Sequence, residues 1–327
     1  MISTRVLRYL LRRLGQGVII IAGILVLNFA LLSLAPGDAA EVLAGEAGGA
    51  DPAYIERLRA QFGLDVPAPE RFFNYAVKLV SFDFGYSPRY GVPISELILG
   101  RLPPTLLLMG ASLVIAITLG IILGVTAARH AGKAADEVIS LLSLLLYATP
   151  LFWVGLMLML FFSVRLGWFP TGGMQDLVAN PAGFAWVMDR LRHLTLPAVT
   201  LALFFLAIYT RLVRASVIEV YTQDYVKLAR AKGVSERRVA YLHVLRNALM
   251  PLVTMVGVQV GALMGGSILV ESVFAWPGLG RLAFEAVASR DQNLLLSILL
   301  VSSVFVVLCN LIVDLLYLRL DPRIELR

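Results

Sequence analysis

The stretch TLLLMGASLVIAITLGIILGVT (105–126) contains no charged residue. At 1.5 Å per residue, a helix of this length crosses the roughly 30 Å hydrocarbon core of a bilayer. The surface helix of a soluble protein would carry polar residues along one face at helical spacing, and this stretch does not. It therefore predicts a membrane-spanning helix.

Five further apolar runs have similar length, and the composition agrees with them. Hydrophobic residues make up 59% of the 327 residues, charged residues only 15%, and the mean hydropathy is +0.82. These values lie outside the range of soluble domains. We predict an all-α polytopic membrane protein with six transmembrane helices: Gly15–Leu34, Thr105–Thr126, Ile139–Phe162, Leu194–Val213, Leu252–Val270 and Leu294–Leu318.

The first run resembles a secretory signal peptide, because four arginines precede it and Ala35 follows it. Its apolar part is longer than the 7–15 residues of a cleavable core. We therefore expect an uncleaved first helix, with segment 1–34 comprising the N-terminus and this span.

The basic residues indicate sidedness. The net charge of +6 could suggest nucleic acid, but lysines and arginines fall between apolar runs rather than on one soluble face. Lysines and arginines concentrate before the first run, in 127–138, in 211–246 and after Leu318. Most acidic residues lie in the other connecting segments, 35–104, 163–193 and 271–293. The positive-inside rule then predicts both termini and 211–246 in the cytoplasm, and 35–104 on the outer side of the membrane.

The outer segment 35–104 has soluble character. Its stretch DPAYIERLRAQFGLD (51–65) predicts a short amphipathic helix that stops at Gly63. The segment is either a folded cap over the outer rim or a docking platform for a partner.

The predicted spans carry almost no ionisable side chains. Spans two, three and five have none, and span six has Asp314 near its cytoplasmic end. Because intramembrane charges usually mark ion paths, an ion-driven transporter would need a coupling group near the midplane. A secondary transporter or passive channel remains the alternative to a subunit driven by an external motor.

The chain also lacks sequence signatures of catalysis. No phosphate-binding G-x-x-x-x-G-K-[ST] motif occurs, and the three histidines have no i,i+4 partner. The single cysteine, Cys309, excludes a disulfide framework and lies in an apolar run. We therefore expect no catalytic residue, no metal site and no cofactor bound by this chain.

A basic stretch, DYVKLARAKGVSERRVAYLHVLRNALMP (224–251), separates spans four and five. Residues 224–232 suit a helix that Gly233 ends in the left-handed conformation, and Ser235 suits the N-cap of a second helix. A basic loop lying on anionic lipid headgroups is one explanation. A two-helix element joined to two spans is better suited to transmitting movement from another protein.

The same stretch, extended to Thr254, resembles the cytoplasmic coupling loop (EAA loop) of ABC importer permeases, in the dipeptide/oligopeptide/nickel branch. The matching positions are Lys227, Leu228, Ala229 and Gly233, with the glutamate and first alanine of the general pattern replaced. Further stretches resemble that branch in order along the chain: 11–40, 101–108, 161–173, 193–203, 273–291 and 321–326. The N-terminal arrangement resembles the B-type permease.

This resemblance implies the type I ABC importer permease fold, with a permease core at 105–318, a coupling loop at 214–250 and a cytoplasmic tail at 319–327. It implies a second, C-type permease subunit, two cytoplasmic ATPases that bind ATP and Mg, and an extracytoplasmic binding protein. Membrane lipids are the other expected partner, and nucleic acid is not one. The ATPase contact is expected at Asp224, Lys227, Ala229, Gly233, Ser235 and Glu236, flanked by Arg237 and Arg238.

Two sets of candidates lie near span five. Glycines and a proline that prevent one straight helix suggest an outer gate, or an ordinary turn, at Gly265, Gly266, Pro277, Gly278 and Gly280. Residues that line the pore, or pack against neighbouring helices, are Met255, Gln259, Met264 and Ser267. Peptides are the cargo most frequent in the branch; nickel chelates, glutathione and other small solutes stay open.

Overall fold

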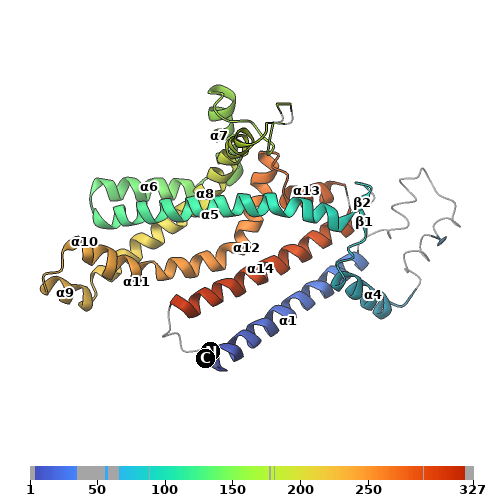
Figure 1. Ribbon diagram of the computed structural model, residues 1–327, viewed down its shortest axis with the longest axis horizontal. Helices are drawn as coiled ribbons and strands as arrows, with labels where there is room; N and C mark the ends of the chain where they lie inside the picture. The colour runs from blue at the N-terminus through green and yellow to red at the C-terminus, as the bar shows by residue number, and fades with distance from the viewer. Residues whose placement is uncertain are drawn as a thin grey trace. The chain divides into compact units, whose positions relative to one another are not determined.

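The computed structural model describes residues 4–34, 56–57, 66–87, 89–176, 178–179, 181–289 and 291–320. Most of these residues are helical (Figure 1). The predicted amphipathic helix at 51–65 lies outside them, apart from residues 56 and 57, which are helical. In chain order the elements are α1 (Thr4–Leu34), α4 (Ala68–Val80), β1 (Tyr86–Ser87), β2 (Val92–Pro93), α5 (Ile94–Arg129), α6 (Ala134–Ala148), α7 (Leu151–Leu158), the π-helix η1 (Met159–Arg165), α8 (Phe184–Tyr221), α9 (Asp224–Ala231), α10 (Glu236–Arg238), the π-helix η2 (Val239–Leu245), α11 (Arg246–Ala248), α12 (Met250–Val273), α13 (Leu279–Ala288) and α14 (Gln292–Leu320).

Five helices of the described chain are long and apolar enough to cross a membrane: Leu11–Leu31, Ile94–Arg129, Phe184–Tyr221, Glu236–Val273 and Gln292–Val313. A sixth crossing is obtained if α6 and the α7–η1 segment, which meet at 105°, form one broken span. The all-α polytopic class is confirmed, with six spans as the upper count.

The predicted straight span 139–162 is wrong in its geometry. Helix α6 ends at Ala148, and Pro150 is the N-cap of α7 with φ −58° and ψ 131°. Because proline has no N–H and disfavours helical geometry in the residue before it, the helix cannot continue through Thr149. Because the residues on both sides of Pro150 are apolar, the hydropathy pattern does not reveal this break.

The chain divides into two compact units, residues 1–100 with 285–327 and residues 101–284. In the first unit α1 packs along α14, where the Asn28 side chain donates to the Leu296 carbonyl over 3.1 Å. The β1–β2 hairpin is held by the buried Ser87 hydroxyl, which donates to Asp291 over 2.6 Å. Asp291 in turn accepts from the Leu294 N–H and so caps α14. The end of segment 35–104 is therefore ordered and fastened to the start of the last helix.

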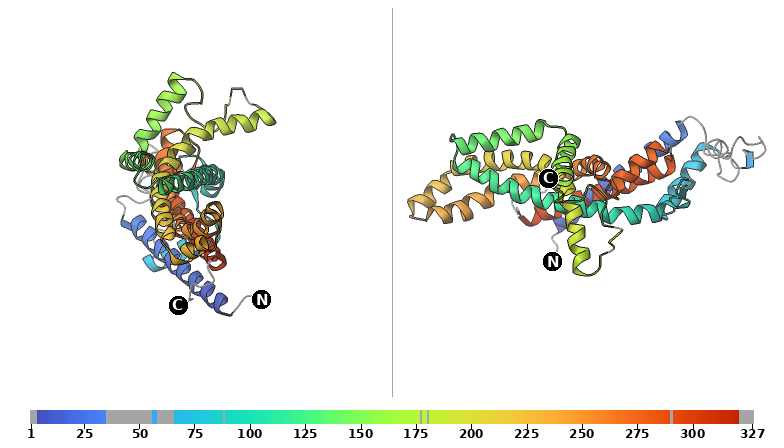
Figure 2. Two further views of the ribbon diagram at one scale, coloured as in Figure 1. Left: turned by 90° about the vertical axis from the view of Figure 1, so that its left-hand side faces the viewer. Right: turned by 90° about the horizontal axis from the view of Figure 1, so that it is seen from above.

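Helix α8 is the centre of the second unit. Two thirds of its apolar window (67%) is buried, against a third or less for the other candidate spans, and α6, α7 and α12 pack on it. Pro197 lies inside α8. Figure 2 shows the first turns of the helix leaving the bundle at a steep angle to the rest. A proline in a helix interior removes one hydrogen bond and bends the helix in this way.

Helix α5 approaches α8 at two glycines one turn apart. A Cβ added to Gly120 would lie 2.8 Å from the Tyr209 Cβ, and one added to Gly124 would lie 2.7 Å from the Val213 Cβ. Small residues at i and i+4 allow close helix contact in membranes. The sequence analysis did not identify this pair.

Replacing Gly124 by valine should destabilise the second unit by about 1–3 kcal/mol, because a core without space must shift to admit the side chain. The measurement is thermal unfolding of the purified protein in detergent. Gly110→Ala on the same helix is the matched control, since a Cβ there meets nothing within 4 Å among the described residues. Equal melting temperatures for both variants would contradict the close contact.

Candidate functional site

The predicted break in the basic stretch is present and has a defined geometry. Helix α9 (Asp224–Ala231) is followed by Gly233 with φ +76°. The Gly233 N–H donates to the Arg230 carbonyl over 2.9 Å, and the Val234 N–H donates to the Ala229 carbonyl over 3.2 Å. These two bonds are a Schellman motif, which satisfies the last carbonyls of a helix and needs a left-handed residue. A Cβ at Gly233 would meet nothing within 4 Å of the described chain, so conformation rather than space requires glycine here.

An ion pair joins the two sides of the break. The Arg230 Nε lies 2.8 Å from Glu236 Oε1, and Nη2 lies 3.2 Å from Oε2. The guanidinium also lies 5.3 Å from the ring centroid of Tyr221, the last residue of α8. Both charged side chains are largely exposed, so the pair contributes no more than about 1 kcal/mol. Its effect is to orient α9 relative to α8 and α10.

One face of this two-helix element (residues 224–238) packs inward. Helix α9 contacts α8 and η2. The buried side chains at this contact and in the following helix are apolar: Val226, Ala229, Val239, Val244 and Ala248. Because α9 has only eight residues, which is too short to be stable alone in water, this packing is what holds it in place.

One predicted contact residue is buried, and the predicted N-cap Ser235 lacks its side-chain hydrogen bond. Ala229 is only 7% exposed and faces the packed side, so it positions α9 instead of offering a contact. Ser235 is the N-cap of α10, with φ −59° and ψ 144°, but its side chain makes no capping hydrogen bond. The first turn of α10 is instead oriented by Glu236 through Arg230.

The other predicted residues are exposed on the outer face of the element: Asp224, Lys227, Gly233, Ser235, Glu236, Arg237 and Arg238. Two large side chains of α9, Tyr225 and Leu228, are also exposed (43% and 55%), and so are Tyr241 and Leu242 of the adjoining η2 (67% and 58%); none of the four was among the predicted residues. The helical spacing of α9 could have indicated this. Tyr225 and Leu228 are three residues apart and share one face, whereas the buried Val226 and Ala229 share another. The face combines apolar anchors with basic residues.

Polar contacts hold Tyr225 against the next helix. The Asn247 amide donates to the Tyr225 hydroxyl over 3.0 Å and to the His243 carbonyl over 2.8 Å. Asn247 therefore links α9 to the helical segment that enters α12. This link fixes the exposed tyrosine ring on the outer face.

A buried carboxylate fastens the end of α8 from which the element projects. Asp136, 4% exposed, accepts from Arg214 Nε over 2.5 Å and from Nη2 over 2.7 Å. It also accepts from the Gly132 N–H and the Ser140 hydroxyl. A bidentate arginine pair is geometrically specific, so α6 and α8 are held in one register here. Neither residue was among the predicted site residues, since charges 78 positions apart give no local signal.

A second buried carboxyl lies at the other end of α12. Glu271 is fully buried (0% exposed) and accepts from the Thr105 hydroxyl over 2.7 Å and from the Arg281 N–H over 2.9 Å. Cβ atoms added to Gly278 and Gly280 would approach its carboxyl group to 2.3 Å and 2.9 Å. We call this group of five residues the carboxyl clasp. Span five was taken to end at Val270, so Glu271 was not recognised as a buried group.

The outer-gate interpretation changes at its glycines. Helix α12 runs unbroken through Gly265 and Gly266 to Val273, so neither residue breaks the helix. Pro277 and Gly278 do lie at the turn between α12 and α13, and Gly280 is the second residue of α13. The two glycines there give room to the Glu271 carboxyl rather than flexibility, since both are buried against it.

The four predicted pore residues differ in burial. Ser267 is 1% exposed, and its hydroxyl donates to the Met264 carbonyl over 2.8 Å. It is therefore buried within this chain and not on a pore surface. Met255, Gln259 and Met264 are half-buried. The Gln259 Oε1 is buried without a hydrogen-bond partner in the described part of the chain.

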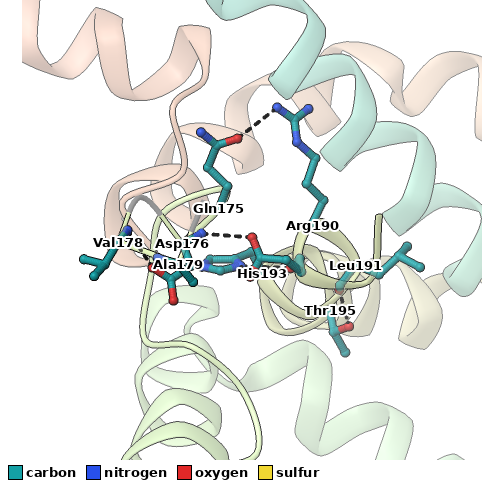
Figure 3. A network of polar contacts seen from close by, with 9 residues as sticks. Gln175, Asp176, Val178, Ala179, Arg190, Leu191, His193 and Thr195 are labelled. Atoms are coloured by element: carbon teal, nitrogen blue, oxygen red, sulfur yellow. Dashed lines mark hydrogen bonds and ion pairs between the residues drawn. The ribbon is translucent and has the colours of Figure 1, made fainter. Parts of the chain in front are cut away.

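The loop before α8 is fastened by a polar network, which Figure 3 shows from close by. The Val178 and Ala179 N–H groups donate to Asp176 Oδ1 over 2.8 and 3.0 Å. These bonds hold the pKa of the Asp176 carboxyl below its usual range, and the bond from Ala179 has the larger effect. The Asp176 N–H donates to Asp189 Oδ2 over 2.9 Å, which ties the loop to α8.

The first turns of α8 complete this network. The Arg190 side chain reaches the Gln175 amide oxygen over 3.3 Å, as Figure 3 shows, and lies 4.1 Å from the Trp186 ring centroid. His193 Nδ1 lies 3.2 Å from Asp189 Oδ1, one turn away. The network is structural, because its charged groups are paired locally or stacked on an aromatic ring.

Comparison with known proteins identifies the family. The model of the "binding-protein-dependent transport system inner membrane component" matches residues 116–326, and that of the corresponding N-terminal region matches residues 6–109. The chain belongs to this family. The resemblance to ABC importer permeases of the peptide branch, drawn from the coupling-loop stretch, is thereby confirmed.

Relatives of this permease match over nearly their whole length. It is 40% identical over 322 residues to the oligopeptide transport system permease protein AppB of Bacillus subtilis, covering 97% of this chain and 99% of the relative. It is 37% identical over 333 residues to the di/tripeptide transport system permease protein DppB of Pseudomonas aeruginosa, covering 98% and 99%. A putative peptide permease protein of Brucella ovis is 41% identical over 320 residues, covering 98% and 99%.

The permease also shares its fold with a solved transporter. A chain of the inward-facing MetNI methionine ABC transporter superposes with a TM-score of 0.56 at 18% identity, covering 69% of this chain and 96% of that one. The identity is low, so the match concerns the fold. It supports the type I importer permease fold that the sequence predicted.

Substitutions at Gly233 test whether glycine is required for its backbone conformation or for lack of space. Gly233→Ala should cost about 1–2 kcal/mol locally, because a residue with a Cβ disfavours φ +76°. Gly233→Asn should cost less, since asparagine tolerates the left-handed region. Amide hydrogen exchange of residues 229–234 measures the effect: exchange should be faster in the alanine variant than in the asparagine variant. The reverse order would contradict the Schellman motif.

Proposed function

We propose that this permease is a pore-forming subunit of an ATP-driven importer of di- and oligopeptides, and that ATPase subunits drive it through the two-helix element. The observation that carries the coupling role is the outer face of that element, where exposed apolar anchors lie among basic residues on a short, rigidly held helix pair. Relatives named as oligopeptide and di/tripeptide permeases, at 37–40% identity over the full length, support the cargo class.

The outer face has the composition of a protein-binding surface. Leu228 and Tyr241 expose 55% and 67% of their surface, and Tyr225 and Leu242 expose 43% and 58%. Interface hot spots are typically such aromatic and apolar anchors enclosed by a polar rim. Lys227, Arg237 and Arg238 would form that rim and favour an acidic surface on the partner. A loop lying on anionic lipid would need the charges but not the ordered tyrosine and leucine.

The element is built to transmit movement. Its second helix begins a helical segment that runs from Glu236 to Val273 with a one-residue turn at Leu249, so a displacement of α10 can reach the far end of α12. Its first helix is joined to α8 through Arg230 and Tyr221, and α8 is held to α6 by the Asp136–Arg214 pair. Coupling of this kind needs one mechanical element that both sites bias.

The complex we propose contains partners that match this division of tasks. A second, C-type permease subunit completes the pore, two cytoplasmic ATPases bind and hydrolyse ATP with Mg, and an extracytoplasmic binding protein delivers the substrate. This chain is the non-catalytic translocation subunit and binds lipid on its outer surface. The match to the binding-protein-dependent family favours this complex over a passive channel or an ion-driven secondary transporter.

Peptide cargo can be tested separately from coupling. A ligand screen on the partner binding protein, followed by uptake with the most tightly bound compound, should return di- or oligopeptides. If nickel chelates, glutathione or another small solute compete instead, the cargo proposal is wrong while the coupling role stands.

Replacing Leu228 by glutamate should weaken ATPase docking about tenfold or more, because a central apolar anchor becomes a buried charge at the interface. The measurement is the affinity of the purified ATPase subunits for the permease in nanodiscs. Val178→Glu is the matched control: Val178 is 96% exposed and lies in the loop at the opposite end of α8. Equal affinities for both variants would show that the two-helix element is not the docking site.

The sidedness gives an independent test. In a Cys309→Ala background, a cysteine at Ser235 should react with a membrane-impermeant thiol reagent only in inverted vesicles, and a cysteine at Val178 only in intact cells. This pattern follows from the positive-inside rule, which puts the basic loop in the cytoplasm. Labelling of Ser235→Cys in intact cells would contradict the orientation and, with it, docking of cytoplasmic ATPases.

A further inference from the structure

Three parts of the second unit meet at the buried carboxyl of Glu271. The side chain comes from the last turn of α12 and is fully buried. One carboxyl oxygen accepts from the Thr105 hydroxyl of α5 over 2.7 Å, and the other accepts from the Arg281 N–H in the first turn of α13 over 2.9 Å. A backbone N–H can only donate, so the geometry requires an acceptor at this position.

The hydrogen-bond chain extends beyond the carboxyl. The Thr105 oxygen accepts from the Leu279 N–H over 2.8 Å, which leaves its hydroxyl hydrogen for Glu271. The fully buried Trp276 donates its indole N–H to the Pro104 carbonyl over 3.0 Å. Pro104 precedes Thr105 on α5, so two adjacent residues of α5 are bound to the turn after α12.

The surrounding glycines show that the site is shaped for the carboxyl group. A Cβ at Gly278 would lie 2.3 Å from the Glu271 Cδ, and one at Gly280 would lie 2.9 Å from Oε2. A Cβ at Gly280 would also lie 2.6 Å from the Ile268 Cα on α12. Real Cβ contacts are never this short, so only glycine at both positions allows the turn to close over Glu271.

The clasp lies at the far end of the helix that begins in the two-helix element. The helical segment from Glu236 to Val273, which has one turn residue at Leu249, links the two sites. We propose that Glu271 is a positioning residue that binds α5 and the start of α13 to α12, so that the three move as one body when α12 is displaced from its other end. This inference rests on the proposed function, because it assumes that the displacement originates at the docked ATPases.

A pathway role for Glu271 has less support than a positioning role. The carboxyl is fully buried, and both of its oxygens already accept hydrogen bonds from within the same chain. A buried acceptor that satisfies two donors costs a great deal to remove, since each donor then loses its partner. The same carboxyl therefore gives the rigidity that transmits a displacement.

The test uses the complete transporter, with both permease subunits, the ATPases and the binding protein, in proteoliposomes. Two spin labels on a Cys309→Ala background replace Leu107 on α5 and Leu269 on α12, which are 43% and 48% exposed. Their separation is measured with and without trapped ATP. Transport and ATP hydrolysis are measured for the unlabelled wild type, Glu271→Ala and Glu271→Gln.

In the wild type the Leu107–Leu269 separation should be the same in both nucleotide states. Glu271→Ala should make it nucleotide-dependent and lower transport about tenfold or more, while ATP hydrolysis changes less than about twofold. The number of ATP molecules used per transported substrate therefore rises. Glu271→Gln should retain most transport, because its amide oxygen can accept from Arg281 and its NH₂ group can donate to the Thr105 oxygen.

One milder variant, and a pair of glycine variants, guard against a folding defect in Glu271→Ala. Thr105→Val removes one hydroxyl from the clasp and should lower transport about threefold with the same rise in ATP used. Gly278→Ala should behave like Glu271→Ala, whereas Gly265→Ala, where a Cβ meets nothing within 4 Å of the described chain, should behave like the wild type.

A label separation that stays constant in Glu271→Ala and Gly278→Ala, or a parallel loss of transport and ATP hydrolysis, would overturn the positioning role. Failure of the proposed function has a different signature. In that case the wild type itself would transport without ATP, or its ATPase subunits would not bind the permease.

Discussion

The constraint on which this structure depends is the absence of water inside a bilayer. A backbone N–H or C=O without a partner costs several kcal/mol there, so a chain that crosses must pair these groups internally, which this chain does in helices. Every other feature follows from how the helices are interrupted and joined. The break at Thr149–Pro150 follows this rule, and the break at Gly233, which lies outside the predicted spans, also pairs its backbone groups. The first satisfies its groups through the Thr149 N–H to the Leu145 carbonyl, and the second through the Schellman bonds.

Two buried carboxyl groups of the second unit, Asp136 and Glu271, each fasten helices at one end of it. Asp136 and Arg214 fix α6 to α8 near the two-helix element, and the carboxyl clasp fixes α5 and α13 to α12 at the far end. Between them lie close apolar contacts, as where Gly124 meets Val213, and buried hydroxyls that bond within their own helix, such as that of Thr200 to the Leu196 carbonyl. Apolar helix faces can slide past each other, whereas bidentate and multiply hydrogen-bonded carboxylates set one register. This distribution suits helices that move together, because the carboxyl groups hold them to one another at both ends.

The candidate site was predictable to the extent that its signals are local. Gly233, the exposed basic residues and the helix boundaries follow from residues within a few positions of each other. The inward direction of Ala229, the burial of Ser267 and the uninterrupted helix at Gly265 and Gly266 do not, because each depends on which neighbouring helix packs there. Glu271 was missed for the same reason. Its position one residue beyond an apolar run reads as a helix end, and only the fold brings Thr105 against it.

The sequence by itself determined the class of the protein, the number of apolar runs, the break at Gly233 and the family. These follow from hydropathy, backbone preference and local motifs, which need no knowledge of distant residues. Tertiary structure decided which helix is central, where the third span breaks and which charged residues are buried and paired. Those outcomes depend on contacts between residues such as Asp136 and Arg214 or Thr105 and Glu271, whose separations in the chain are 78 and 166 residues. A sequence pattern does not specify such contacts, because the energy of a buried carboxyl depends on the donors that the folded chain brings within hydrogen-bonding distance.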